Sequence, residues 1–274
     1  MNSFMRERET TRPYSLNKRR RLTMLALLVP ALSFASQGRD ESSDQVGDHK
    51  AIPLLIWQLT DQMNQPLPAK PVIQRLVDYL SQKSGIHFRL QGYPWNRALK
   101  LANEGVAPIW GLSVTPQRAQ HFVYSHAIYE SNVWMLVNKS FATPIPNLAA
   151  LAGKRVSIFR GVSYGAEFDA AKNHLFQVEE DSDNLRARVA KLLAGRCDVM
   201  LYANHHRNVE QVILELKESG FDPQQLKVLD NPLLSEPAYI AISKEKIATF
   251  PMEELNRVID AGRRNGEIMR LLRD

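Results

Sequence analysis

Short apolar runs alternate with amphipathic stretches from residue 52 to the end of the chain, and this alternation limits the fold more than any other feature of the sequence. The runs have the length of buried strands, and the stretches between them carry apolar residues at helical spacing. Such alternation is typical of an α/β architecture, which is the fold class we predict. The predicted strands cover residues 53–57, 87–90, 107–112, 133–137, 155–159, 198–202 and 238–242. The predicted helices cover residues 71–83, 95–103, 165–173, 184–194 and 208–219.

The first 35 residues have the pattern of a secretory leader rather than of a folded segment. A basic stretch, residues 18–21, precedes an apolar segment, residues 22–32, that is too short to span a bilayer. Small residues follow, and we predict cleavage after Ala35. The adjacent Arg19 and Arg20 leave the twin-arginine export route open beside the general secretory route. The sequence therefore predicts an exported, periplasmic protein.

The composition of the remaining chain limits its partners. The leader holds seven of the 35 Lys and Arg residues and two of the 29 Asp and Glu residues, which leaves 28 basic against 27 acidic residues. A chain with so little net charge is not expected to bind nucleic acid or an anionic membrane. Residues 36–50 are polar and charged, and we predict a flexible arm there. The single cysteine, Cys197, cannot form an internal disulfide, and we expect it in the core.

Two loops carry residues suited to holding an anion. In the first, residues 109–118, an apolar run leads through Gly111 and Ser113 into a helix start with Thr115 as the N-cap. Backbone N–H groups at this start, the Ser113 hydroxyl and the Arg118 guanidinium would together offer a carboxylate complementary donors. The alternative is a surface arginine beside an ordinary helix cap.

The second loop, residues 160–165, follows the predicted strand 155–159. It contains Gly161 and Ser163, and its glycines would let a ligand approach the backbone closely. One such loop in each half of the chain predicts a ligand held between two lobes. Aromatic residues near the predicted strand ends are candidates for the walls of that cleft, although each would also fit a plain core: Trp57, Trp110 and Tyr202.

Three other patterns admit both a chemical and a structural interpretation. The second loop matches the G-x-S-x-G nucleophile elbow at Ser163. A hydrolase would then use His205 or His206 as its base. However, the sequence upstream has no oxyanion loop of the HGGG type. The two histidines have no further ligand at metal-binding spacing, so we expect them at a solvated helix start and predict no metal site. We interpret the acidic triplet 179–181 as a polar turn.

The order of these motifs resembles the family 3 extracellular solute-binding proteins of ABC importers, also called type 2 periplasmic binding proteins. The resemblance covers nearly the whole chain after the leader. Its most specific block is GLSVTPQR at residues 111–118, with the glycine, the hydroxyl and the T-x-x-R motif in order. The supporting segments are PWNRAL at 94–99, NEG at 103–105, YS at 124–125, IY at 128–129, GVS at 161–163, LAGRCDV at 193–199 and NGEI at 265–268.

The resemblance implies two α/β lobes joined by two hinge crossovers, near residues 133–137 and 238–242. Lobe 1 would comprise residues 51–134 and 243–274, and lobe 2 would comprise residues 135–242. In amino-acid-binding members the arginine of T-x-x-R grips the ligand carboxylate together with the preceding hydroxyl and glycine. The ligand-binding residues that follow from the two loops, the aromatic walls and the resemblance are Arg118, Ser113, Gly111, Trp57, Gly161, Ser163, Tyr202 and Asn204.

Two departures from the family pattern bear on the ligand. Pro108 stands where an aspartate is common, and Ala203 and Asn204 stand where members usually have an acidic residue that pairs with the ligand ammonium. We therefore predict a monomeric binding protein that captures a small polar carboxylate-bearing ligand, an amino acid or related compound, for an ABC permease. We predict no cofactor and no catalysis. A membrane sensor as the partner, a serine hydrolase acting through Ser163 and a dehydratase of the same fold are the alternatives.

Overall fold

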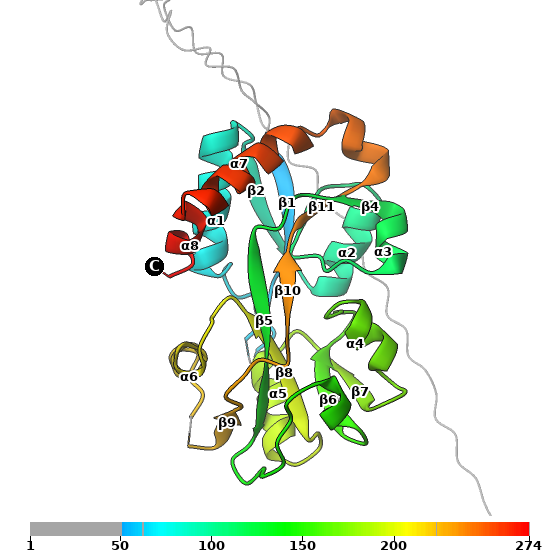
Figure 1. The fold of residues 1–274 in the computed structure, drawn as a ribbon, viewed down its shortest axis with the longest axis vertical. Coiled ribbons are helices and arrows are strands. Elements are labelled where there is room, and N and C mark those ends of the chain that lie inside the picture. Colours follow the sequence, from blue (N-terminus) through cyan, green and yellow to red (C-terminus); the bar gives the residue numbers. More distant parts are fainter. Residues whose placement is uncertain (1–50, 62, 223, 274) are drawn as a thin grey trace, which may run out of the picture. The chain divides into compact units, whose positions relative to one another are not determined.

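A computed structural model describes residues 51–61, 63–222 and 224–273. The predicted leader, residues 1–35, and the predicted arm, residues 36–50, lie outside the described residues. In the part that is described, two β-sheets are each packed between helices (Figure 1). None of the helices in this part is long and apolar enough to span a bilayer.

The first sheet has the strand order β2-β1-β3-β11-β4. β2 (Phe88–Tyr93) and β3 (Ile109–Trp110) lie parallel to β1 (Ile52–Trp57), whereas β11 (Ile240–Ser243) is antiparallel to β3 and to β4 (Phe122–Tyr124). The helices beside this sheet are α1 (Pro71–Ser84), α2 (Trp95–Asn103), α3 (Pro116–His121), α7 (Met252–Arg264), α8 (Glu267–Leu271) and the 3-10 helix η2 (Lys244–Thr249).

Alternation along β1 explains why this sheet needs helices on both faces. Leu54 and Ile56 belong to a core shared with α1, α7 and α8, while Leu55 belongs to a second core shared with α2. Successive side chains of a strand point to opposite faces, so an apolar run such as 54–56 must be covered twice. α1 itself begins with Pro71 in its first turn and ends at Gly85, whose φ of 71° closes the helix in the left-handed conformation.

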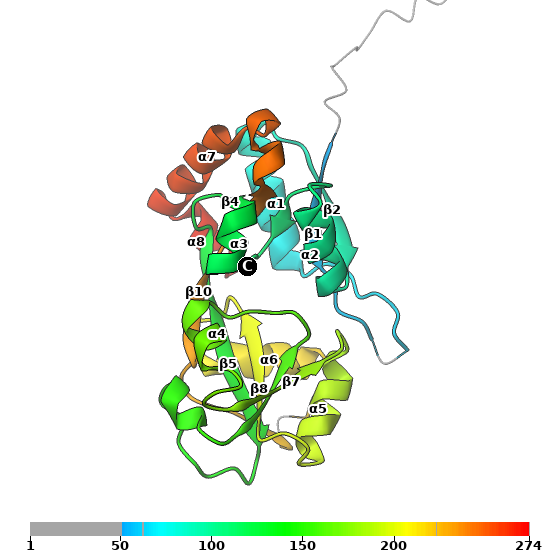
Figure 2. The ribbon, with the colours of Figure 1, turned by 90° about the vertical axis from the view of Figure 1, so that its right-hand side faces the viewer.

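The second sheet has the strand order β10-β5-β8-β6-β7, and β9 also pairs with β5. Its strands are β5 (Tyr129–Asn138), β6 (Arg155–Phe159), β7 (Gln177–Asp181), β8 (Val199–Asn204), β9 (Leu226–Val228) and β10 (Leu234–Ala238). Its helices are α4 (Ala166–Ala171), α5 (Leu185–Leu193), α6 (Val209–Glu218) and the 3-10 helix η1 (Leu148–Leu151). Figure 2 shows α4 and α5 on opposite sides of this sheet.

The chain passes between the sheets twice. It leaves the first sheet after Tyr124 and enters the second at Tyr129, then returns between Ala238 and Ile240. β5 and β10 are antiparallel neighbours at these passages and lie side by side in Figure 1. The predicted lobe boundaries, after residues 134 and 242, fall inside β5 and β11, and the division into lobes stays a prediction.

Some predicted elements begin and end at the same residues as the observed ones, and one predicted turn is wrong. The helix 95–103 and the strand 155–159 match α2 and β6, and Cys197 is buried with 3% of its surface exposed, as predicted. The acidic triplet 179–181 is not a turn, because it forms the end of β7, paired in parallel with β6. An edge strand exposes alternate side chains to solvent, so it tolerates charges that a sequence pattern assigns to a loop.

Candidate functional site

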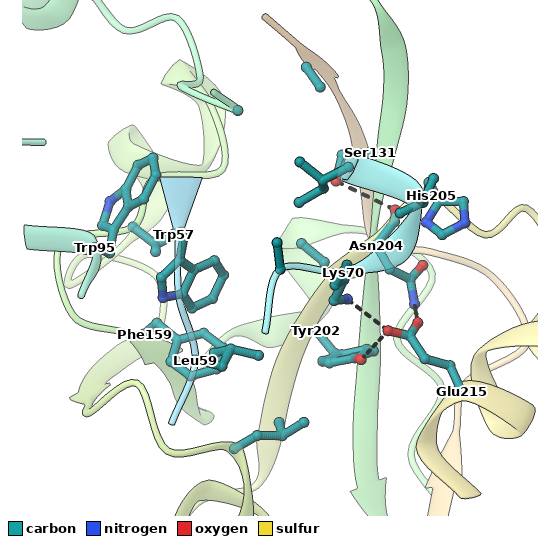
Figure 3. A pocket seen from close by; sticks show the side chains of 18 of the residues that line it. Trp57, Leu59, Lys70, Trp95, Ser131, Phe159, Tyr202, Asn204, His205 and Glu215 are labelled. Atoms are coloured by element: carbon teal, nitrogen blue, oxygen red, sulfur yellow. Dashed lines mark hydrogen bonds and ion pairs between the residues drawn. The ribbon is translucent and has the colours of Figure 1, made fainter. Parts of the chain in front are cut away.

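A cavity of about 660 Å³ is lined by side chains from both sheets. The predicted wall residues Trp57, Trp110 and Tyr202 all line it, and Gly111, Ser113, Ser163 and Asn204 do so as well. Figure 3 shows an aromatic group on one side of this cavity and a polar group on the other. The lining is thus of the mixed kind that binds small molecules, with apolar walls and a few polar groups.

The aromatic side is built around Trp57 at the end of β1. Its ring meets the Phe159 ring edge-on, with 4.4 Å between centroids, and lies 6.2 Å from the Trp95 ring. The Trp57 Nε1–H donates to Asp183 Oδ1 at 2.7 Å, and Asn184 Nδ2 donates to the Asp61 carbonyl at 2.7 Å. Both hydrogen bonds join the first-sheet part of the chain to the second-sheet part, beside the cavity.

We call the meeting point of the two predicted anion loops the loop end of the cavity; it comprises Gly111, Ser113 and Arg118 with Gly161 and Ser163. The Ser113 hydroxyl donates to the Ser163 carbonyl at 2.9 Å. The Arg118 guanidinium donates to the carbonyls of Ser113, at 3.2 Å, and Gly161, at 3.3 Å. The structure therefore brings the two loops together across the molecule, although they are more than forty positions apart in sequence.

The donors of this end are engaged with the protein itself. The Gly111 N–H donates to the Tyr239 carbonyl at 2.7 Å, and the Arg118 N–H donates to the Thr115 hydroxyl, which confirms Thr115 as the N-cap. Neither Arg118 nor Gly161 is among the residues that line the cavity. Burial lowers the pKa of Arg118, while Tyr124 and Asp169 act in the opposite direction. The guanidinium thus lies behind the cavity wall, beside it rather than in it.

Gly161 explains how the loops approach so closely. Its φ of 73° lies in the left-handed region, and a Cβ at this position would lie 1.9 Å from Asn96 Oδ1. The Gly161 carbonyl also accepts a hydrogen bond from Trp95 Nε1 at 2.9 Å. The α2 start, at Trp95 and Asn96, is therefore packed directly on the second loop.

We call the polar group at the other side of the cavity the carboxylate end; it comprises Lys70, Tyr202, Asn204, His206 and Glu215. Glu215 extends from α6 and accepts hydrogen bonds from Lys70 Nζ at 2.7 Å, the Tyr202 hydroxyl at 2.8 Å and Asn204 Nδ2 at 3.0 Å. His206 Nε2 lies 3.2 Å from its second oxygen. The Lys70 ammonium also lies 5.4 Å from the centroid of the Tyr202 ring. One carboxylate thereby organises this whole side, as Figure 3 shows for four of the five residues.

The charges at this end reinforce one another. Burial alone would raise the pKa of Glu215, but the hydrogen bonds and charges of His206, Lys70 and Tyr202 outweigh it, and the pKa is lowered. Burial would lower the pKa of Lys70, but Tyr202 and Glu215 raise it above its usual value. His205, next to this group, has its pKa lowered to about 4, first by burial and then by His206 and Lys70. Lys70 and Glu215 are thus both charged at neutral pH, and His205 is neutral.

The two histidines do not lie at a solvated helix start, which corrects that expectation. Both are partly buried, and α6 begins later, at Val209 with Asn208 as its N-cap. The His206 carbonyl accepts hydrogen bonds from Asn132 and Trp134, so the segment is fixed against β5. Across the described ranges, no three His, Cys, Asp or Glu side chains are grouped so that they could hold a metal ion.

Ser163 does not have the partner that a hydrolase nucleophile needs. It is buried, with 6% exposure, and its hydroxyl donates to Asp169 Oδ2 at 2.6 Å and accepts from the Gly165 N–H at 3.2 Å. A serine nucleophile transfers its proton to a neighbouring base, usually a histidine. Here the hydroxyl stabilises the loop before α4, and the two glycines of the G-x-S-x-G pattern, Gly161 and Gly165, both have a positive φ.

Glu236 of β10 also lines the cavity, and the sequence patterns did not point to it. A Cβ on Gly165 would lie 2.3 Å from its Oε1, so its carboxylate lies against the start of α4. Burial raises the pKa of Glu236 to about 7, and Glu130, Asp169 and Glu167 add to this effect. This carboxyl is therefore partly protonated at neutral pH.

Sequence reasoning also missed Lys70 and Glu215. Lys70 is the N-cap residue of α1 and offers no capping side chain, and Glu215 lies at the edge of the apolar face of α6, next to the buried Leu216. An acidic residue flanking an apolar helix face is a weak signal, since most such residues are solvated. Positions 203 and 204 hold no acidic residue, but Glu215 of α6 places a carboxylate within hydrogen-bonding distance of Asn204.

Comparison with known proteins identifies the fold. No protein-family model and no curated protein matches the chain. Among solved structures, an ancestral arginine-binding protein bound to arginine has a TM-score of 0.59 at 17% identity, over 81% of this chain and 96% of the other. The GluR0 ligand-binding core from Nostoc punctiforme in complex with L-glutamate has a TM-score of 0.59 at 16% identity, over 80% and 96%.

A third similar structure is the ancestral amino-acid-binding protein AncCDT-1, a precursor of cyclohexadienyl dehydratase, with a TM-score of 0.58 at 18% identity over 81% of this chain and 93% of the other. Identities this low show a common fold and nothing finer. The predicted two-lobed α/β fold is confirmed: this chain has the fold of the amino-acid-binding proteins.

Proposed function

We propose that this protein is an exported solute-binding protein that closes around a small polar ligand bearing a carboxylate, such as an amino acid, and performs no chemistry on it. The cavity carries the proposal, because side chains from both sheets line it and a bound molecule would contact both. Proteins of the same fold bind arginine, glutamine and glutamate, which supports an amino acid or related compound as the ligand.

In this proposal the two sheets are the cores of two lobes, and the passages through β5 and β10 are the hinges. The ligand carboxylate replaces the Gly161 carbonyl on Arg118, since a guanidinium binds a charged carboxylate more strongly than a neutral carbonyl. The protein is released into the periplasm after its leader is removed, acts as a monomer and delivers the ligand to an ABC permease. The proposed ligand-binding residues are Arg118, Ser113, Gly111, Trp57, Gly161, Ser163, Tyr202 and Asn204.

A thermal-shift screen of the purified protein against amino acids, organic acids and amines tests this function. A compound that binds only the folded state raises the Tm by mass action, and we expect at least one to do so. Arg118→Ala should abolish that rise while the Tm without ligand stays within a few degrees. Arg97→Ala is the matched control, because this exposed arginine of α2 stacks on Tyr93 outside the loop end. A screen in which no compound raises the Tm would contradict the proposal.

A further inference from the structure

Four of the five residues of the carboxylate end belong to one part of the chain, whereas the loop end draws on both parts. Tyr202 and Asn204 extend from β8, His206 follows that strand and Glu215 extends from α6, so the second-sheet part alone orients the carboxylate. Lys70 enters from the opposite part, on the segment before α1, and its partner Glu215 is 145 positions away. The ammonium is therefore the one member of the carboxylate end that comes from the first-sheet part, and Tyr202, Asn204 and His206 contact Glu215 through bonds that do not involve it.

The position of this ammonium is one that a ligand cation would occupy. It lies 2.7 Å from a carboxylate oxygen and 5.4 Å from the centroid of an aromatic ring. A carboxylate beside the face of an aromatic ring is a recurrent means of binding ammonium and guanidinium groups. The Lys70 side chain is 35% exposed and Glu215 is 19% exposed, so the cation is the more accessible member of the pair.

The charge of the cavity favours a cation as well. Within the described residues, the acidic side chains of the lining are Asp61, Glu215, Glu218 and Glu236, and the basic ones are Lys70 and Arg186. If Lys70 moves away, the lining holds one basic residue against these acids. A cationic ligand group would replace the positive charge of Lys70, whereas a ligand with only negative charge would not.

We propose that Glu215, the Tyr202 ring and the Asn204 amide form the binding site for a cationic group of the ligand, a primary amine or a guanidinium, and that the Lys70 ammonium competes with the ligand for this site. The inference rests on the proposed solute-binding function and names its substrate class. It also assigns Lys70 a role in specificity, because a neutral ligand group cannot displace a charged ammonium from a carboxylate without leaving the carboxylate unpaired.

Isothermal titration with matched probes tests this inference. The probes are L-arginine, L-citrulline, in which a neutral ureido group replaces the side-chain guanidinium, and putrescine, which has amines and no carboxylate. We expect Lys70→Met to raise the affinity for arginine and putrescine at least tenfold, because the competing cation is removed, and Lys70→Arg to leave it near the wild-type value. Glu215→Gln should lower the affinity for both at least tenfold. Lys100→Met, at an exposed lysine of α2, should change neither.

The outcomes separate this inference from the broader function. Unchanged or weaker arginine and putrescine binding by Lys70→Met, or full binding by Glu215→Gln, overturns the cation site. If wild-type protein binds anionic or neutral members of the thermal-shift panel and Glu215→Gln binds them equally well, the solute-binding function stands and the cation site does not. If neither wild type nor Lys70→Met binds any compound, both proposals fail. The Tm of each variant shows whether it is folded, and Lys70→Gln replaces Lys70→Met if the latter is not.

Discussion

The two ends of the cavity join the same two parts of the chain by different physical means. At the loop end, every acceptor is a neutral backbone carbonyl: a serine hydroxyl, an indole N–H and the Arg118 guanidinium donate to them, and Gly161 allows the close approach. At the carboxylate end, one partly buried ion pair between Lys70 and Glu215 makes the connection. The loop end depends on shape and the carboxylate end depends on charge, so substitutions and pH should affect them differently.

The largest effect is expected from Glu215→Gln, which removes a charge that several donors share. Charged hydrogen bonds contribute about 1.5 to 3 kcal/mol each, so the free energy of unfolding at pH 7 should fall by about that amount. Urea denaturation measures this, and Glu218→Gln, at an exposed acid of the same helix, is the matched control. Equal free energies of unfolding of the two variants would mean that the charge of Glu215 contributes nothing to joining the two parts of the chain.

The effect of Glu215→Gln on the free energy of unfolding should depend on pH. Since the folded-state pKa of Glu215 is lowered from 4.5, its stabilisation is present above pH 4.5 and is lost as the pH falls toward the folded-state value. The difference in unfolding free energy between wild type and Glu215→Gln should therefore be constant from pH 6 to 8 and shrink below pH 4.5. A difference that grows on acidification would contradict the assignment of Glu215 as the charged partner.

Gly161→Ala tests the loop end through shape. Any side chain in the left-handed region costs roughly 1 to 2 kcal/mol, and here the Cβ must also displace Asn96. Gly153→Ala is a matched control, because its φ of 70° carries the same cost and its Cβ would meet nothing within 4 Å. Gly161→Ala should lose more stability in urea than Gly153→Ala, and only Gly161→Ala should increase the radius of gyration in solution scattering. If Asn96→Ala, added to Gly161→Ala, restores the wild-type radius of gyration, the contact with Asn96 causes the increase. Identical scattering of the two glycine variants would exclude this contact as the cause.

Ser113→Ala should have a smaller effect, since it removes one neutral hydrogen bond, to the Ser163 carbonyl. Such a bond contributes about 0.5 to 1.5 kcal/mol. The loss should appear as a lower Tm and a weaker ligand-induced rise. Ser140→Ala, which removes a hydroxyl bonded to the nearby Asn138, should leave the ligand response unchanged. If the two serine variants respond alike to ligand, Ser113 does not act across the cavity.

The smallest effect is expected at Glu236, the half-buried acid whose carboxylate lies against the start of α4. Because its folded-state pKa is raised from 4.5 to about 7, the protonated form contributes stability below pH 4.5, and this is lost as the pH rises to 7. Glu236→Gln should therefore be more stable than wild type at pH 8, by less than about 1 kcal/mol because solvent screens a partly exposed charge. Unfolding curves at pH 5 and pH 8 measure this, with the exposed Glu245→Gln as the control; a variant that is less stable at pH 8 would contradict the raised pKa.

The sequence by itself determined the local elements and predicted the two loops that meet at one end of the cavity. Helical spacing and the N-cap at Thr115 specify α2 and the start of α3, and the apolar run at β6 specifies its strand, because these depend on neighbours in the sequence. The loop residues Ser113 and Ser163 were identifiable for the same reason, since glycines and hydroxyls beside a helix start have a local signature.

Only the tertiary structure decided which of these residues meet and which charge faces the cavity. The Lys70–Glu215 pair has no local signature, because its members are far apart in sequence and each fits an ordinary helix surface. The assignment of 179–181 as a turn was wrong for a related reason, since the edge position that permits these charges in β7 exists only once β6 is beside it. Whether Arg118 faces a ligand or a carbonyl likewise depends on how closely the second loop approaches it, which the packing of Gly161 on Asn96 determines.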